Sequence, residues 1–240
     1  MLNNKEILIN GLKELNIDAD ESLFYKFETY KELLLEWNKK INLTAIEDEK
    51  EIYIKHFIDS LSCFTTQYIK NGDSVIDVGT GAGFPGVPFK IYKEDLKLTL
   101  LDSLNKRINF LKEVCTNLKL KDVEFVHGRA EDFGQNPDYR EKYDIATARA
   151  VANLAVLLEY CVPFIKVGGH FICLKGPSAD EEMKDSQKAI QTLGMEFVEK
   201  INIKLPYTDI NHVILVFKKI KNTPKKYPRK AGKPSKEPIK

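Results

Sequence analysis

The chain has 240 residues and a formal net charge of +2, a length that suits one α/β domain with an appendage. It contains no run of 18 apolar residues, and its first residues, Met1-Leu-Asn-Asn-Lys-Glu, lack the apolar core of a signal peptide. We therefore expect a soluble cytoplasmic protein that does not enter a membrane. The four cysteines are widely spaced in apolar surroundings, which favours buried free thiols over disulfides or a metal site: Cys63, Cys115, Cys161 and Cys173.

The modest net charge hides an asymmetry. Residues Lys218 to Lys240 contain ten Lys or Arg and one acid, Glu237, whereas the rest of the chain contains 27 basic and 34 acidic residues. A basic tail on an acidic body indicates an anionic partner at one place. Beyond about residue 219 the hydrophobic pattern stops and prolines alternate with basic residues, so residues 220–240 are expected to be extended and poorly ordered when isolated from the rest of the chain.

Residues 1–70 predict a helical extension packed on the main domain. Two helices are expected within residues 3–40, because large apolar side chains from Leu23 to Trp37 recur at helical spacing, and residues 47–70 continue the pattern. His56 lies in this part. A lone histidine among apolar residues is more often a satisfied core or capping residue than a catalytic base.

Strand and helix patterns alternate over residues 71–219, the predicted main domain. Seven strands are expected at residues 75–78, 98–101, 123–126, 143–147, 170–174, 197–203 and 213–217, and four helices at 84–92, 106–118, 154–164 and 180–193. This alternation predicts an α/β fold with a mostly parallel, doubly wound sheet and helices on both faces. Only the last two strands lack a helix between them, so we expect them to form an antiparallel hairpin.

The most informative stretch is residues 74–87. A short apolar strand containing Asp77 ends at alternating glycines, Gly79, Gly81 and Gly83, which allow a sharp turn and a close approach of backbone N–H groups to a ligand. A literal search also finds the dinucleotide pattern G-x-G-x-x-G here, but that match alone is weak. An acid inside the strand end suits a ligand with a cationic end, and the segment resembles motif I of class I S-adenosylmethionine methyltransferases. A glycine-rich turn without a ligand is the remaining interpretation.

Other strand ends add polar residues to the same edge, where an open parallel sheet binds its ligands. Asp102 and Ser103 follow the second strand. A carboxylate there can accept hydrogen bonds from a ribose diol or can cap the next helix, and the sequence leaves both roles open. After the third strand, the backbone N–H near Ala130 and a carboxylate from Glu131 or Asp132 are candidates for binding an adenine edge.

Two basic residues follow the next strands. Arg149 ends the fourth strand and would lie near the reactive end of a cofactor, where it would position the reactants. A structural salt bridge is its rival role, because a buried arginine needs an anion. Lys175 follows the fifth strand and is a candidate for a phosphate at the mouth of the site.

Several catalytic motifs are missing from the sequence. After the fourth strand there is no Asn or Asp before Pro-Pro-aromatic and no Pro-Cys pair. Their absence argues against methylation of an amino group of adenine or cytosine, and against a covalent route to a pyrimidine carbon. The sequence also lacks a Gly-x-Ser-x-Gly elbow, a Walker A motif and a metal-ligand cluster.

Five segments, which together cover essentially the entire chain, resemble the RsmG (GidB) family of ribosomal RNA methyltransferases. They are Trp37-Asn-Lys-Lys-Ile-Asn-Leu-Thr, His56-Phe-Ile-Asp-Ser-Leu, Asp77-Val-Gly-Thr-Gly-Ala-Gly-Phe-Pro-Gly, Leu100-Leu-Asp-Ser-Leu-Asn-Lys-Arg and Lys226-Tyr-Pro-Arg-Lys-Ala-Gly-Lys-Pro. The glycine segment and the Tyr-Pro-Arg-Lys-Ala-Gly segment are the most specific. The chain departs from the family pattern at Asn105, where Gly is frequent, and at Thr147, where Ser is common.

The resemblance implies a seven-stranded class I methyltransferase fold and methyl transfer from S-adenosylmethionine to N7 of one guanine in 16S ribosomal RNA. It places cofactor contacts on Gly79, Phe84, Asp102, Ala130, Glu131 and Arg149. Guanine N7 carries a lone pair and no proton, so the implied reaction needs positioning rather than a general base. In a monomeric enzyme of this kind, the candidates for RNA phosphate contacts are Lys175, Lys225, Lys226, Arg229 and Lys230.

Two other functions stay open on the sequence. An NAD-dependent oxidoreductase would use the literal G-x-G-x-x-G, and binding of S-adenosylmethionine but not NADH would exclude it. A non-catalytic RNA-binding or assembly protein would keep the fold without the activity. Unchanged ribosomal RNA methylation after replacement of Gly79 by a bulky residue would favour that second alternative.

Overall fold

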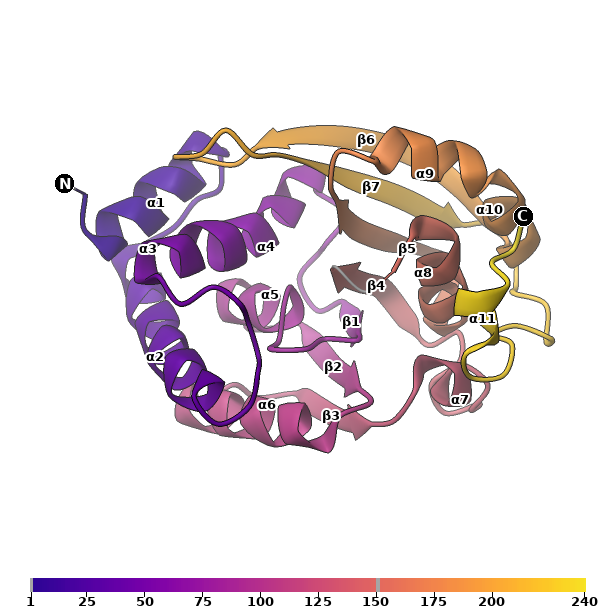
Figure 1. Ribbon diagram of the computed structural model, residues 1–240, viewed down its shortest axis with the longest axis horizontal. Coiled ribbons are helices and arrows are strands. Elements are labelled where there is room, and N and C mark those ends of the chain that lie inside the picture. Colours follow the sequence, from indigo (N-terminus) through magenta and orange to yellow (C-terminus); the bar gives the residue numbers. More distant parts are fainter. Residues whose placement is uncertain (1, 150–151) are drawn as a thin grey trace.

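The computed structural model describes residues 2–149 and 152–240, which form a seven-stranded sheet with helices on both faces (Figure 1). The strands are β1 (Ser74–Val78), β2 (Lys97–Asp102), β3 (Val123–His127), β4 (Tyr143–Arg149), β5 (Ile165–Lys175), β6 (Met195–Lys204) and β7 (Asn211–Lys219). They lie in the order β3-β2-β1-β4-β5-β7-β6. Strands β1 to β5 pair in parallel, and β7 runs antiparallel to both of its neighbours.

The seven predicted strands and the closing hairpin are confirmed. The largest difference is in β5, which begins at Ile165 rather than at His170. The pair Gly168-Gly169 interrupts the apolar pattern there, and Gly168 has a left-handed backbone with φ +91°. A prediction from the hydrophobic pattern of the sequence ends a strand at such a glycine pair, whereas β5 continues through it.

In the described parts of the chain, six α-helices lie between the strands: α5 (Gly86–Tyr92), α6 (Asn105–Asn117), α7 (Ala130–Phe133), α8 (Leu154–Cys161), α9 (Ala179–Asp185) and α10 (Gln187–Leu193). The prediction of one helix over residues 180–193 is wrong, because the backbone leaves helical geometry at Ser186 (φ −96°, ψ 2°). The helix expected at 84–92 begins at Gly86, since Pro85 is its N-cap. The helix expected at 154–164 ends as a 3₁₀ turn over Val162–Phe164.

The N-terminal extension is helical as predicted. It comprises α1 (Asn4–Glu14), α2 (Glu21–Asn38), α3 (Glu49–Ile52), a π-helical turn (Tyr53–Ile58), α4 (Asp59–Leu61) and a 3₁₀ turn (Ser62–Thr66). The side chains of Asn3 and Asp20 accept N–H groups at the starts of α1 and α2, where helices leave donors unpaired. These helices lie over the same face of the sheet as α5 and α6 (Figure 1).

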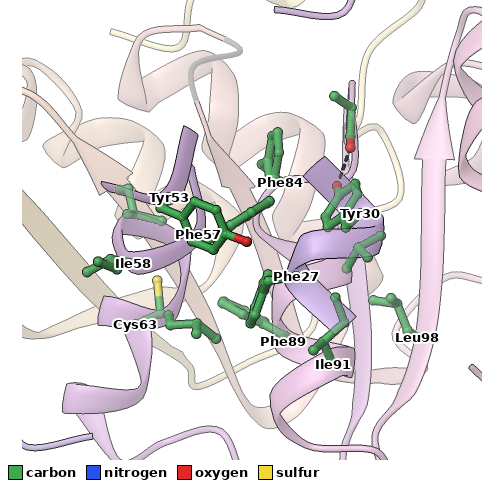
Figure 2. Close-up of a cluster of buried hydrophobic side chains, with 14 of the residues drawn as sticks. Phe27, Tyr30, Tyr53, Phe57, Ile58, Cys63, Phe84, Phe89, Ile91 and Leu98 are labelled. Atoms are coloured by element: carbon green, nitrogen blue, oxygen red, sulfur yellow. Dashed lines mark hydrogen bonds between the residues drawn. The ribbon is translucent and has the colours of Figure 1, made fainter. Parts of the chain in front are cut away.

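An aromatic cluster joins this extension to the glycine segment. Figure 2 shows Phe27 and Tyr30 of α2 packed with Phe57 of the π-helical turn and with Phe84. Tyr30 is fully buried and donates a hydrogen bond to the carbonyl of Ala82, drawn dashed in Figure 2. Helix α2 therefore supports the glycine segment directly.

The opposite face of the sheet packs on α7, α8, α10 and the C-terminal tail, which is yellow in Figure 1. The tail is not isolated, so the disorder expected of an isolated tail is not seen here. Residues 220–240 lie against α7 and α8, include a short helix α11 (Lys233–Lys236), and bury the side chains of Tyr227 and Ile239. Such anchors are spaced irregularly, so no hydrophobic period signals them.

The four cysteines are buried and carry free thiols, as predicted. Within residues 2–149 and 152–240, no helix combines the length and the apolar character needed to cross a membrane. The same residues contain no group of three or more His, Cys, Asp or Glu side chains arranged to hold a metal ion.

Candidate active site

Asp77, at the end of β1, braces the glycine segment from behind. Its Oδ2 accepts hydrogen bonds from the Thr80 hydroxyl at 2.7 Å and from the Gly86 N–H at 2.9 Å. The side chain is fully buried, and this burial raises the pKa of Asp77 to about 6. Asp77, a predicted cofactor contact, therefore lies behind the turn and does not line the cavity described below.

The three glycines of the turn all have left-handed backbones, with φ +69° at Gly79, +60° at Gly81 and +98° at Gly83. A Cβ on Gly83 would lie 2.5 Å from the Tyr30 hydroxyl oxygen. The N–H of Gly81 donates to Asp102 Oδ2 at 2.9 Å. Gly79 lines the cavity described next. The contacts of Gly81 and Gly83 lie within the protein and hold the turn in shape.

A cavity of about 330 Å³ opens at the carboxyl ends of β1, β2 and β3, and we call it the first cavity. Its volume is in the range of small-molecule sites. It brings together half of the predicted cofactor residues: Gly79, Asp102, Ser103, Ala130 and Glu131. Tyr160 of α8 and Gly232 of the tail complete its wall together with residues of the β1, β2 and β3 ends.

Asp102 is the charged group that ties the first cavity to the glycine turn. It is 3% exposed, and its Oδ1 accepts the Leu104 N–H at 2.9 Å just before α6. Its Oδ2 accepts the Gly81 N–H and lies 3.4 Å from Arg107 Nη1. Each carboxylate oxygen has a second lone pair, so Asp102 can brace the loop and still accept a hydrogen bond from a ligand.

Glu131 faces the tail as well as the cavity. Its Oε1 accepts the N–H of Gly232 at 3.0 Å, although the two residues are 101 positions apart. Tyr160 donates to or accepts from Ser235 of the tail at 2.9 Å. One wall of the first cavity is therefore formed with the C-terminal segment.

A second cavity of about 420 Å³ lies at the carboxyl ends of β4 and β5 and contains Arg149 and Lys175. Arg149 Nη1 donates to Asp59 Oδ2 at 2.8 Å and to the Lys55 carbonyl at 3.1 Å. Its guanidinium also stacks 4.8 Å from the ring centre of Phe84. Arg149 thus lies in the second cavity rather than the first, and it makes the salt bridge expected of its rival, structural role.

Two histidines of the second cavity have opposite pKa shifts. Burial, with the charge of Arg149, lowers the pKa of His56 to about 3, so this ring is neutral at physiological pH. The hydrogen bond from His212 Nδ1 to Asp59 Oδ1, at 2.6 Å, raises the pKa of His212. Burial alone would raise the pKa of Asp59, but His212 and Arg149 hold it below its ordinary value.

His56 matches the sequence interpretation of a satisfied histidine. Its Nε2 lies 2.8 Å from the Thr44 hydroxyl and its Nδ1 lies 3.2 Å from Arg149 Nη2. Its ring stacks on Phe84 with centres 4.5 Å apart. Phe84 is itself buried in this cluster, so the structure places the predicted cofactor residue Phe84 in the core behind Arg149.

The predicted RNA-binding residues divide into two groups. Lys225, Lys226 and Lys230 are exposed on the tail. Lys175 is nearly buried and pairs with Glu182 at 2.6 Å, and Arg229 forms a bidentate pair with the buried Glu159. The structure therefore places Lys175 and Arg229 in ion pairs within the protein rather than on an open basic surface.

Sequence reasoning missed four residues of these sites: Asp59, Tyr160, His212 and Gly232. Asp59 stood within a recognised segment, but its partner His212 is 153 positions away, so no local spacing signalled the pair. Tyr160 lay in a predicted helix and Gly232 in a tail that was expected to be disordered when isolated. The specific Tyr-Pro-Arg-Lys-Ala-Gly segment was the available signal for Gly232.

Comparison with known proteins agrees with this geometry. The family model described as GidB, rRNA small subunit methyltransferase G, matches residues 24–210. A ribosomal RNA small subunit methyltransferase G of Alkaliphilus oremlandii is 63% identical over 236 residues, covering 98% of this chain and 99% of its own. The protein of the same name from Alkaliphilus metalliredigens is 59% identical over 239 residues, covering both chains fully.

Solved structures support the fold. One described as the complex between the Haloferax volcanii Trm112 methyltransferase activator and the putative methyltransferase has a TM-score of 0.58 at 15% identity, covering 78% of this chain and 98% of that chain. M. jannaschii TYW2, solved in complex with AdoMet, has a TM-score of 0.50 at 15% identity, covering 68% and 76%. The sheet order is thus that of class I methyltransferases, and the chain belongs to the GidB family of rRNA small subunit methyltransferases.

Proposed function

We propose that this chain transfers the methyl group of S-adenosylmethionine to N7 of a guanine in 16S ribosomal RNA. Its family membership supports an rRNA methyltransferase. The observation that carries the proposal is the first cavity, where the glycine turn and the nearly buried Asp102 carboxylate face one space at three strand ends. A site of this kind suits a nucleoside with a charged substituent.

The residues of the first cavity fit the cofactor. Asp102 has free lone pairs for the ribose hydroxyls, and Gly79 adds no side chain where a ligand must approach the backbone. Ser103, Ala130 and Glu131, which also line the first cavity, are proposed to contact the cofactor there. Asp77, Gly81 and Gly83 act indirectly in this proposal, because they hold the turn in shape.

The second cavity is proposed to receive the guanine. When bound, S-adenosylmethionine supplies a methyl group on a positively charged sulfur, and the positive charge ends on the purine. Carboxylates offset part of the positive charge of this cavity: Arg149 and His212 share Asp59, and Lys175 pairs with Glu182. Lys55, which also lines the cavity, pairs with Glu51. His56 is neutral and adds no further positive charge to oppose the reaction.

No general base is required, so the residues act by holding the reactants in line. Arg149, fixed by Asp59 and by its stacking on Phe84, is the proposed positioning residue. Lys225, Lys226 and Lys230 are proposed to contact RNA phosphates, which predicts binding that weakens as salt rises. We also propose that the enzyme works as a monomer in the cytoplasm, where ribosomes are assembled.

A methyl-transfer assay tests the proposal. The purified chain is incubated with isotope-labelled S-adenosylmethionine and small-subunit RNA, either naked or assembled, and the RNA is digested to nucleosides for mass spectrometry. Label in 7-methylguanosine is expected, with no binding of NADH in a parallel titration. Label in a different nucleoside, or NADH binding without any transfer, would reject the proposed function.

A further inference from the structure

We propose that Arg229 is a positioning residue for the cofactor, which acts by anchoring the C-terminal segment as a wall of the first cavity. This inference rests on the proposed function, because it assumes that the first cavity binds the cofactor. It differs from the sequence interpretation, in which Arg229 contacts RNA phosphate. Figure 1 shows the segment, in yellow, passing over α8 beside α7.

The anchor is an ion pair in which one partner is wholly buried. Arg229 Nε lies 2.8 Å from Glu159 Oε1, and Arg229 Nη2 lies 2.6 Å from Glu159 Oε2. The Arg229 backbone N–H also donates to Glu159 Oε1 at 2.8 Å. Glu159, on α8, is 0% exposed. Loss of the guanidinium would leave a buried carboxylate without its counter-charge, which is a costly arrangement.

Neighbouring contacts fix the chain on the N-terminal side of this anchor. Arg140 Nη1 donates to the carbonyl of Tyr227 at 2.8 Å, and Arg140 Nη2 donates to that of Thr223 at 2.8 Å. Gln135 donates to the carbonyl of Pro228 at 2.9 Å. These bonds leave the segment little freedom before it reaches Arg229.

Three residues beyond the anchor, the segment enters the cavity wall. Gly232 lines the first cavity and donates its N–H to Glu131, which lines the same cavity. Ser235 bonds to Tyr160, another lining residue. The position of Gly232 therefore depends on Arg229, and the orientation of Glu131 depends on Gly232.

This arrangement also separates two roles within one basic segment. The Arg229 guanidinium pairs with the Glu159 carboxylate. Its Nη2 also donates a hydrogen bond to the Glu237 carbonyl at 2.8 Å. The exposed lysines beside it, Lys226 and Lys230, remain available to an anionic partner. A ligand that contacts both the first cavity and the docked segment binds the docked state more tightly than the undocked state. Binding of that ligand therefore stabilises the docked segment.

The test measures binding of S-adenosylhomocysteine in the absence of RNA by isothermal titration calorimetry. Arg229→Ala is expected to weaken binding at least tenfold. Lys236→Ala, which removes one exposed positive charge from the same segment, is the matched control and is expected to bind within twofold of the wild type. A phosphate-binding Arg229 would leave this RNA-free affinity unchanged, so an Arg229→Ala variant that binds like the wild type overturns the inference.

A second measurement uses the wild-type chain and remains decisive if Arg229→Ala does not fold. Hydrogen–deuterium exchange of the peptide containing Gly232 is followed with and without saturating S-adenosylhomocysteine. Slower exchange with the ligand is expected, and equal exchange with proven binding would overturn the inference. A wild-type chain that fails to bind the ligand at all would instead reject the proposed function.

Discussion

Asp102 shows why the sequence could not assign a role to a single acid. The sequence offers a ribose contact and a helix cap as alternatives. In the structure Leu104 is the N-cap of α6 and no side chain caps the helix, so Asp102 is not its cap. Asp102 instead accepts the Leu104 N–H and lines the first cavity. One carboxylate has enough acceptor sites to brace the loop and to bind a ligand. Sequence spacing reports the strand end, but it does not report which lone pairs remain free.

We expect Asp102→Ala to weaken binding of S-adenosylhomocysteine by more than about tenfold, because a hydrogen bond to a charged group contributes about 1.5–3 kcal/mol. Isothermal titration calorimetry measures the change. Asp132→Ala removes an exposed carboxylate nearby and should leave the affinity unchanged. Equal affinities for the two variants would contradict the role given to Asp102.

Asp59 and His212 illustrate a pair that no sequence window contains. The folded-state pKa of His212 is raised above 6.5, so its charged contribution is fully present below pH 6.5 and is lost as pH rises through the raised value. The pKa of Asp59 is lowered below 3.8, so its contribution is lost only as pH falls through that lowered value. The pair is therefore expected to stabilise the fold most between about pH 3.8 and 6.5, the ordinary pKa values of the two groups.

His212→Gln should accordingly reduce the free energy of unfolding by about 1.5–3 kcal/mol at pH 6, the typical contribution of a charge-assisted hydrogen bond. The reduction should become smaller at pH 9, because the wild-type ring loses its proton as pH rises through its raised pKa. Thermal or chemical unfolding of both proteins at the two pH values provides the comparison. A reduction that grows with pH would show that the charge of His212 does not stabilise the fold.

At the scale of elements, the glycine turn was predictable, whereas the reason for each glycine was not. Alternating glycines indicated a sharp turn, and all three have positive φ. Only the structure shows that Tyr30 of α2 and Leu111 of α6 lie so close to Gly83 that a Cβ there would clash with both. The sequence carries no sign of this contact, because Tyr30 lies 53 positions earlier.

Gly83→Ala should destabilise the fold by more than about 2 kcal/mol, since it combines a left-handed alanine with a Cβ 2.5 Å from the Tyr30 hydroxyl. Gly168→Ala is a matched control: its φ is also positive, at +91°, but a Cβ there meets nothing within 4 Å. The difference between the two free energies of unfolding measures the clash. Equal losses would mean that Tyr30 and Leu111 move aside freely.

The tail is the element that sequence reasoning described least well. Its prolines and lysines have the composition of a disordered segment, and composition reports the absence of a periodic apolar face. The actual anchors are isolated side chains: Tyr227 and Ile239 join one buried hydrophobic cluster, and Arg229 pairs with Glu159. A single buried ion pair is invisible to any pattern of hydrophobic periodicity.

At the scale of the whole molecule, the sheet and its helices followed from alternating strand and helix periods, and the fold was predicted almost completely. The sequence predicts which residues lie at the carboxyl ends of the strands. It does not predict that these residues divide between two cavities. Asp102 ends β2 and Arg149 ends β4, the strands on either side of β1, and the two residues line different cavities.

The division into residues 1–70, 71–219 and 220–240 stays a prediction. One buried cluster contains Phe27 and Leu34 of the extension together with Val87 and Leu98 of the main part. We therefore expect a chain lacking residues 1–70 to expose this cluster and to bind the dye ANS or aggregate. A deletion variant that remains monomeric and cooperatively folded would show that the main part is independent.

A crystal structure of the chain with S-adenosylhomocysteine tests the central claim most directly. The account predicts that the nucleoside occupies the first cavity and lies against the backbone of Gly79. Its ribose hydroxyls are expected to donate hydrogen bonds to the Asp102 carboxylate. Density for the ligand at another location, or none under saturating conditions, would contradict the account.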